Sequence, residues 1–147
     1  MGKNTALKPW IEVVSLHPDV VSEKFSEDIF ALDLGPLADG SKNVPPVYRD
    51  AEQFFRSSYL TGGLRSLLKD VLSRLSGGAG NRVLKLITPF GGGKSHTLAA
   101  LYHAAKKRKA LDVIPEGRGL PQVDKVRTAV FDGQFFDATN GKQAGDF

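Results

Sequence analysis

The residues of this chain that are best suited to chemistry lie in one short stretch, TPFGGGKSHT, at residues 88–97. The standard phosphate-binding pattern is G-x-x-x-x-G-K-[ST], in which backbone N–H groups surround the phosphates. Its Lys contacts the β and γ oxygens and its hydroxyl binds Mg²⁺. Gly93-Lys94-Ser95 fits the end of this pattern, but Thr88 stands where its first glycine is expected. The match is therefore partial, and the surrounding elements must decide.

A nucleotide phosphate site is favoured over a simple glycine-rich turn. Glycine reaches positive φ freely and places no Cβ against a phosphate. A Lys in the first turn of a helix opposes the helix dipole by roughly 0.3 to 1 kcal/mol unless an anion lies there. The residues predicted to bind ATP are Phe90, Gly91, Gly92, Gly93, Lys94, Ser95 and His96, with Ser95 also binding Mg²⁺. For His96, a partly exposed capping role is favoured over phosphate contact.

A second acidic site usually accompanies such a loop in ATPases, where an apolar strand ends in Asp and often Glu. Residues 128–133, TAVFDG, offer such a strand with Asp132 at its end. Gly133 and Gln134 follow, so the Glu is missing. Asp132 is thus a weak candidate for Mg²⁺ binding and catalysis, and a plain strand-end residue is the favoured interpretation.

Composition narrows the class of protein without naming a substrate. The chain has 147 residues, 41% of them hydrophobic and 24% charged, as in globular domains. No cysteine is present, which excludes disulfides and thiolate metal sites. The net charge of +4 is too small to indicate nucleic-acid binding by itself. No apolar run is long enough to span a membrane, so a cytoplasmic location without membrane partners is predicted.

Two helices are predicted ahead of the loop. Asp50 is placed as an N-cap with Gln53 three residues later, followed by the apolar residues Phe54, Phe55 and Tyr59. Thr61-Gly62-Gly63 interrupts this helix. Leucine and valine then recur at i, i+3, i+4 and i+7 up to Leu75, which predicts a second, amphipathic helix that Gly77-Gly78 ends.

The loop itself is predicted to lie inside a βαβ unit. Residues 82–88, RVLKLIT, and 125–131, KVRTAVF, are apolar or β-branched runs typical of buried parallel strands. A helix is predicted between them over residues 94–109, with Leu98, Leu101, Tyr102 and Ala105 on its buried face. The basic run 106–109, KKRK, is interpreted as a solvated helix end that suits the dipole.

The fold class predicted from these elements is α/β, a helical lead-in followed by the first βαβ unit of a P-loop NTPase, which the family resemblance described below implies to be the incomplete beginning of an AAA+-like domain. Residues 1–49 form a lead-in with one helix at about 22–32, and residues 50–147 form the N-terminal part of the NTPase domain. Trp10 and Phe135-Phe136 are interpreted as packing residues.

Three segments together resemble the N-terminal part of the DUF499 family, large ATPases assigned to the AAA+ superfamily. The first is FFRSSYLTGGL at residues 54–64, which fits the family's helix pair, and the second is TPFGGGKSH at residues 88–96, which fits its loop. The third is AVFDGQFFDATNG at residues 129–141. In that family Thr also replaces the first glycine, so the resemblance implies that Thr88 is a family trait.

The resemblance implies ATP and Mg²⁺ as cofactors, with hydrolysis dependent on residues beyond this chain. It also implies self-association or contact with the rest of the ATPase, and an association with DNA-related or phage-defence systems. The alternative is a binding module that holds a nucleotide or a partner and hydrolyses nothing. A P-loop kinase is disfavoured, because it does not need the long helices ahead of the first strand.

Overall fold

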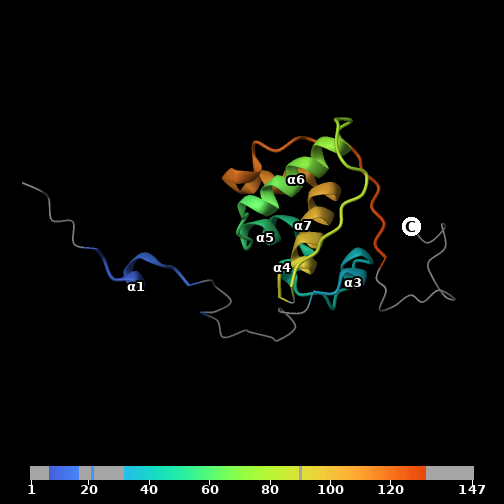
Figure 1. The fold of residues 1–147 in the computed structure, drawn as a ribbon. Helices are drawn as coiled ribbons and strands as arrows, with labels where there is room; N and C mark the ends of the chain where they lie inside the picture. Colours follow the sequence, from blue (N-terminus) through green and yellow to red (C-terminus); the bar gives the residue numbers. More distant parts are fainter. Residues whose placement is uncertain (1–6, 17–20, 22–31, 90, 132–147) are drawn as a thin grey trace, which may run out of the picture. The chain divides into compact units, whose positions relative to one another are not determined.

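A computed structural model describes residues 7–16, 21, 32–89 and 91–131 of the chain (Figure 1). The chain divides into two units, residues 1–31 and residues 32–147. The described part of the first unit holds one short helix, α1 (Trp10–Val13). The second unit contains α3 (Leu34–Ala38), α4 (Pro46–Arg49), α5 (Ala51–Arg56), α6 (Gly62–Leu75), α7 (Lys94–Lys106) and the 3-10 helices η2 (Arg108–Val113) and η3 (Pro115–Gly117).

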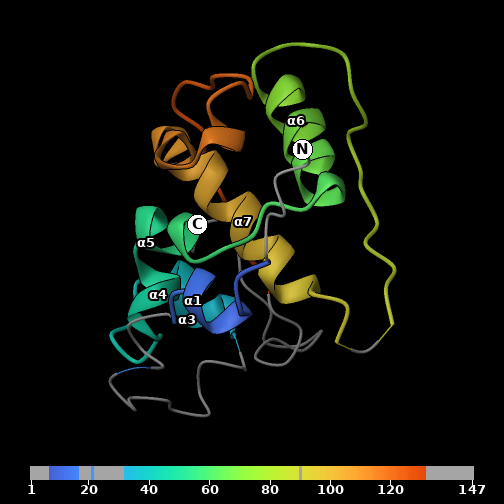
Figure 2. The same cartoon turned by 90° about the vertical axis from the view of Figure 1, so that its left-hand side faces the viewer.

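The α/β prediction is wrong for the described residues, since none of them lies in a β-strand. The AAA+-like P-loop NTPase beginning with its βαβ unit is therefore not seen. Residues 82–88 are extended but exposed, with Val83 at 84% and Ile87 at 77% of their full accessibility. Figure 2 shows this segment as an extended trace beside α6. A strand requires a partner whose backbone completes its hydrogen bonds, and an apolar run does not by itself provide one.

The second expected strand also stays unpaired among the described residues, although its side chains alternate. Val126, Thr128 and Val130 are half-buried, whereas Lys125, Arg127 and Ala129 are exposed. This period of two is the side-chain pattern of an extended chain lying on an apolar surface. The β-branched sequence therefore produces the extended conformation without the sheet.

The helix starts at Asp50 and Thr61 and the helix end at Gly77 are confirmed, but Tyr59, predicted as an apolar contact of the first helix, lies after the end of α5 and is 85% exposed. The Asp50 carboxylate accepts a hydrogen bond of 2.8 Å from the Gln53 N–H, which begins α5. Thr61 caps α6 in the same way, accepting 3.2 Å from the Leu64 N–H. Gly77, with φ of 92°, terminates α6 in the left-handed region that favours glycine. These signals act over three or four residues, which is why they could be predicted locally.

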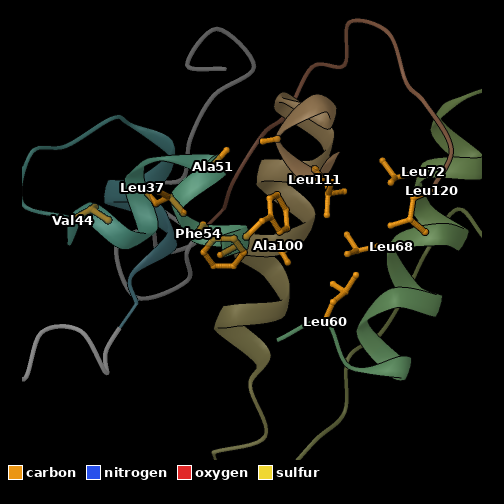
Figure 3. Packing of buried hydrophobic residues seen from close by; sticks show 14 residues of the cluster. Leu37, Val44, Ala51, Phe54, Leu60, Leu68, Leu72, Ala100, Leu111 and Leu120 are labelled. Atoms are coloured by element: carbon orange, nitrogen blue, oxygen red, sulfur yellow. The ribbon is translucent and has the colours of Figure 1, made fainter. Parts of the chain in front are cut away.

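The hydrophobic core surrounds α7, as Figure 3 shows. Phe54 approaches α7 from the side of α5, while Leu60, Leu68 and Leu72 approach it from the side of α6. Phe54 and Phe55 are 1% and 0% exposed, so each aromatic ring is fully removed from water. Leu37 and Val44, from the segment expected to be a lead-in, also belong to this core.

The predicted buried face of α7 is right only in part, since Leu101 and Tyr102 are half-buried and pack against the core but Leu98 is exposed. The residues in the core are Ala99, Ala100, His103 and Ala104. Small side chains there let α5 and α6 approach the helix closely. The predicted stripe instead lines a pocket of about 450 Å³, together with Leu34, Val71, Leu75 and residues 126–131. Leu98 is accordingly 42% exposed. The helix carries apolar residues on two sides, and the side with the larger side chains is the less buried of the two.

The basic run at the end of α7 is not a uniform solvated helix end. The helix stops at Lys106, because Lys107 leaves helical geometry with φ of −141° and ψ of 67°. Arg108 then turns inward and is only 4% exposed. Its guanidinium binds three backbone carbonyls and the Asp112 carboxylate, so it organises the connection after α7. The solvated interpretation is wrong for Arg108.

Several predictions fall outside the described residues. They concern most of the helix at 22–32, the loop residue Phe90, the acidic candidate Asp132 and Phe135-Phe136. Trp10 is described and is 70% exposed, so its interpretation as a packing residue is wrong. None of the described helices has the length and apolar character needed to cross a membrane.

Candidate phosphate-binding loop

The candidate loop joins the extended segment 82–88 to the first turn of α7, and its described residues are exposed. Gly93 is the N-cap of α7 in the left-handed region, with φ of 73° and ψ of 22°. No side chain caps this end of the helix. The first amide groups of a helix have no intrahelical partner, so they remain available to an anion at the positive end of the dipole.

The structure requires glycine at all three central positions. Gly91 and Gly93 have φ of 76° and 73°, a conformation that L side chains rarely adopt. Gly92 has ordinary φ, but a Cβ there would lie 2.5 Å from the Thr88 hydroxyl oxygen. The Gly92 N–H also donates 3.1 Å to the Pro89 carbonyl, which closes the turn. The glycine run therefore serves backbone geometry at each residue, as the sequence indicated.

The Lys94 ammonium lies over the loop that contains it. Its Nζ donates to the Pro89 carbonyl at 3.0 Å, to the Thr88 hydroxyl at 3.1 Å and to the Thr88 carbonyl at 3.2 Å. The cation is thus held by Thr88 and Pro89, at the start of the glycine loop. An anion with several oxygens suits this arrangement, which combines a cation, two left-handed glycines and an uncapped helix end.

Ser95 lies in the first turn of α7 and is exposed. Its hydroxyl is the single predicted Mg²⁺ ligand. Within the residues that the structure describes, no group of three His, Asp or Glu side chains could hold a metal ion. Asp132 and Phe90 lie outside the described residues.

His96 packs away from the loop, against α5. Its ring centroid lies 4.8 Å from that of Phe54, with an angle of 32° between the rings. Burial lowers the pKa of His96 from its ordinary value of 6.5, so the neutral ring is favoured. A neutral ring stacked on Phe54 fixes the start of α7 against α5. This contact favours neither a cap nor a phosphate ligand, but a packing role.

His103 is a structural residue that the sequence did not reveal. It lies on the opposite side of the same Phe54 ring system, with centroids 5.1 Å apart, and is 4% exposed. Its Nε2 lies 2.7 Å from the Tyr48 carbonyl oxygen, so the neutral ring donates its N–H there. Its spacing of seven residues from His96 places both rings on one helix face, which is the signal that could have revealed the pair.

We expect the protein to lose stability as the pH falls below about 6.5. Burial lowers the pKa of His103, against the raising effects of the Tyr48 carbonyl and Asp50, and Lys106 lowers it further. The unfolded chain therefore binds protons that the folded chain excludes, so stability is full above pH 6.5 and decreases toward the lowered pKa. Thermal unfolding between pH 7.5 and 5.5 should show a falling midpoint. His103→Gln should flatten this dependence, and a pH-independent midpoint in the parent protein would contradict the assignment.

Residues 7–128 match the family model described as DUF499 N-terminal domain, a range that contains the whole candidate loop. No curated protein and no solved structure matches the chain.

Proposed function

We propose that this chain, which belongs to the DUF499 N-terminal domain family, binds the phosphates of ATP with Mg²⁺ at residues 88–95. The loop amides and Lys94 bind the phosphates, and Ser95 binds the metal ion. Hydrolysis would also need an acidic residue and further charged groups. The sequence offers Asp132 as the acidic candidate, and this residue lies outside the described part of the chain.

The observation that carries the proposal is the combination of three required glycines with a central lysine. A chance glycine-rich turn needs positive φ at one or two positions, but here Gly92 is also required by its distance to Thr88. Lys94 is the first residue of α7 and its ammonium bonds back to the Pro89 carbonyl, at the end of the helix where a cation is unfavourable unless an anion accompanies it. Both features are explained by a bound polyphosphate.

A fold other than the expected sheet is compatible with this role. Phosphate binding by a helix N-terminus and successive backbone amides depends on the local geometry of the loop. The loop and α7 supply that geometry from residues 88–95, whereas residues 82–88 are only an extended lead into it. Nucleotide binding therefore does not require the β-ladder that the described residues lack.

Ser95→Ala should weaken ATP binding mainly in the presence of Mg²⁺. The assigned role of the hydroxyl is to bind the cation, so its loss should leave metal-free binding within about twofold and weaken Mg²⁺-dependent binding by about 3- to 10-fold, the upper part of the range of one net hydrogen bond. Calorimetric titration with ATP, with Mg²⁺ and with EDTA, measures both values. Ser66→Ala, at an exposed position of α6, is the matched control. Equal losses in both conditions would contradict the metal-binding role.

A further inference from the structure

All donors of the Lys94 ammonium are already used in this structure. An ammonium group has three N–H donors and no acceptor. The three acceptors are the Thr88 carbonyl, the Thr88 hydroxyl and the Pro89 carbonyl. A phosphate oxygen can therefore receive a hydrogen bond from Lys94 only when one of these contacts is released.

The three acceptors differ in how easily they can be released. The Pro89 carbonyl also accepts from the Gly92 N–H at 3.1 Å and from the Thr88 hydroxyl at 3.2 Å, so it is fixed by the turn. The Thr88 carbonyl belongs to the backbone that enters the turn. The Thr88 hydroxyl alone is a side-chain group, and rotation about χ1 moves it without changing the backbone. Its release moves no backbone atom, although the hydroxyl then also gives up its own hydrogen bond to the Pro89 carbonyl.

The position of the Thr88 side chain depends on Gly92. A Cβ at residue 92 would lie 2.5 Å from the Thr88 hydroxyl oxygen and 2.6 Å from its Cβ, distances that atoms of real side chains do not reach. The glycine run therefore leaves room for a side chain at residue 88. Threonine at the place of the expected first glycine is thus part of the loop's construction.

We propose that Thr88 is a positioning residue that restrains Lys94 through its hydroxyl, and that an arriving phosphate displaces this hydroxyl from the ammonium. The inference rests on the proposed function and concerns the regulation of that same site. Binding then exchanges one hydrogen bond for another, so the Thr88 contact reduces the affinity of the loop and makes it more selective for ligands with enough charge to displace the hydroxyl.

Removing the hydroxyl should strengthen binding. Thr88→Val and Thr88→Ala both eliminate the competing acceptor, and we expect each to bind MgATP about 2- to 10-fold more tightly, the range of one net hydrogen bond. Thr88→Ser keeps the hydroxyl and should bind like the parent protein. In a Lys94→Ala background the Thr88→Ala change should have no effect, because the contact it removes no longer exists. Calorimetric titration measures the parent protein and its five variants, and circular dichroism checks that each is folded.

The outcomes separate this inference from the proposed function. Parent protein that binds MgATP while both hydroxyl-free variants bind equally or more weakly would overturn the role of Thr88 and leave the site intact. A hydroxyl-dependent change that persists in the Lys94→Ala background would also overturn it, because it could not act through Lys94. Failure of the parent and every Thr88 variant to bind would overturn the proposed function, and this inference with it.

Discussion

Arg108→Ala should lower the free energy of unfolding by about 3 to 5 kcal/mol, the scale measured when one partner of a buried charged network is removed. The guanidinium donates to the carbonyls of Pro121 at 2.7 Å, Gly117 at 2.9 Å and Leu120 at 2.7 Å, and to the Asp112 carboxylate at 3.0 Å. Truncation removes this donor from the buried Leu120 carbonyl and the half-buried Pro121 carbonyl, whereas the Gly117 carbonyl keeps the Leu120 N–H. The loss is a large part of the total stability of an ordinary domain.

Urea unfolding followed by circular dichroism measures this effect. Arg108→Lys keeps one cation but replaces the fork of donors by a single ammonium, so it should recover only part of the loss. Lys109→Ala is the matched control, because it removes a neighbouring cation that is exposed. We expect it to change stability by less than about 0.5 kcal/mol. An Arg108→Ala protein as stable as the Lys109→Ala protein would show that the network contributes nothing net.

Lys94→Ala should weaken ATP binding by about 10- to 100-fold. The variant removes the only side-chain cation that the loop places over its own turn, and a hydrogen bond to a charged group contributes about 1.5 to 3 kcal/mol. Thermal stability should change little, because the lysine is exposed and its partners remain accessible to water. Calorimetric titration with MgATP gives the affinity.

Lys69→Ala is the control for net charge, since Lys69 lies on the exposed side of α6. Both variants lower the positive charge of the chain equally, so any long-range attraction of ATP falls equally in both. Binding reduced to the same extent in the two variants would show that Lys94 acts only through net charge. Unchanged binding in Lys94→Ala would remove the lysine from the site.

Local signals in the sequence predicted their elements well. Asp50 with Gln53, and Thr61 with Leu64, specify helix starts because each contact spans three residues. The requirement for glycine at Gly91 and Gly93 was also visible, since positive φ is a property of the residue itself, whereas the requirement at Gly92 depends on the Thr88 side chain. For these features the residue and its neighbours within three or four positions contain the whole physical cause.

Features that depend on distant residues could not be predicted in this way. The acceptors of Arg108 lie up to 13 residues later in an irregular segment, so a basic run gave no sign that one of its members is buried. Residues 82–88 have the composition of a strand, but pairing depends on a second segment that the run does not specify. The choice between the two apolar sides of α7 depended on Phe54 and Leu68, which reach the helix only in the folded chain.

Mapping of backbone amides by NMR tests directly whether residues 88–95 bind the phosphates of ATP. A ¹⁵N-labelled chain titrated with MgATP should show its largest shift changes at the amides of Gly91, Gly92, Gly93, Lys94 and Ser95. The amides of α6 at Leu68 and Leu72, which are buried, should change little. Saturable changes centred on the loop are the predicted result. Changes centred elsewhere, or none at millimolar MgATP, would contradict the claim.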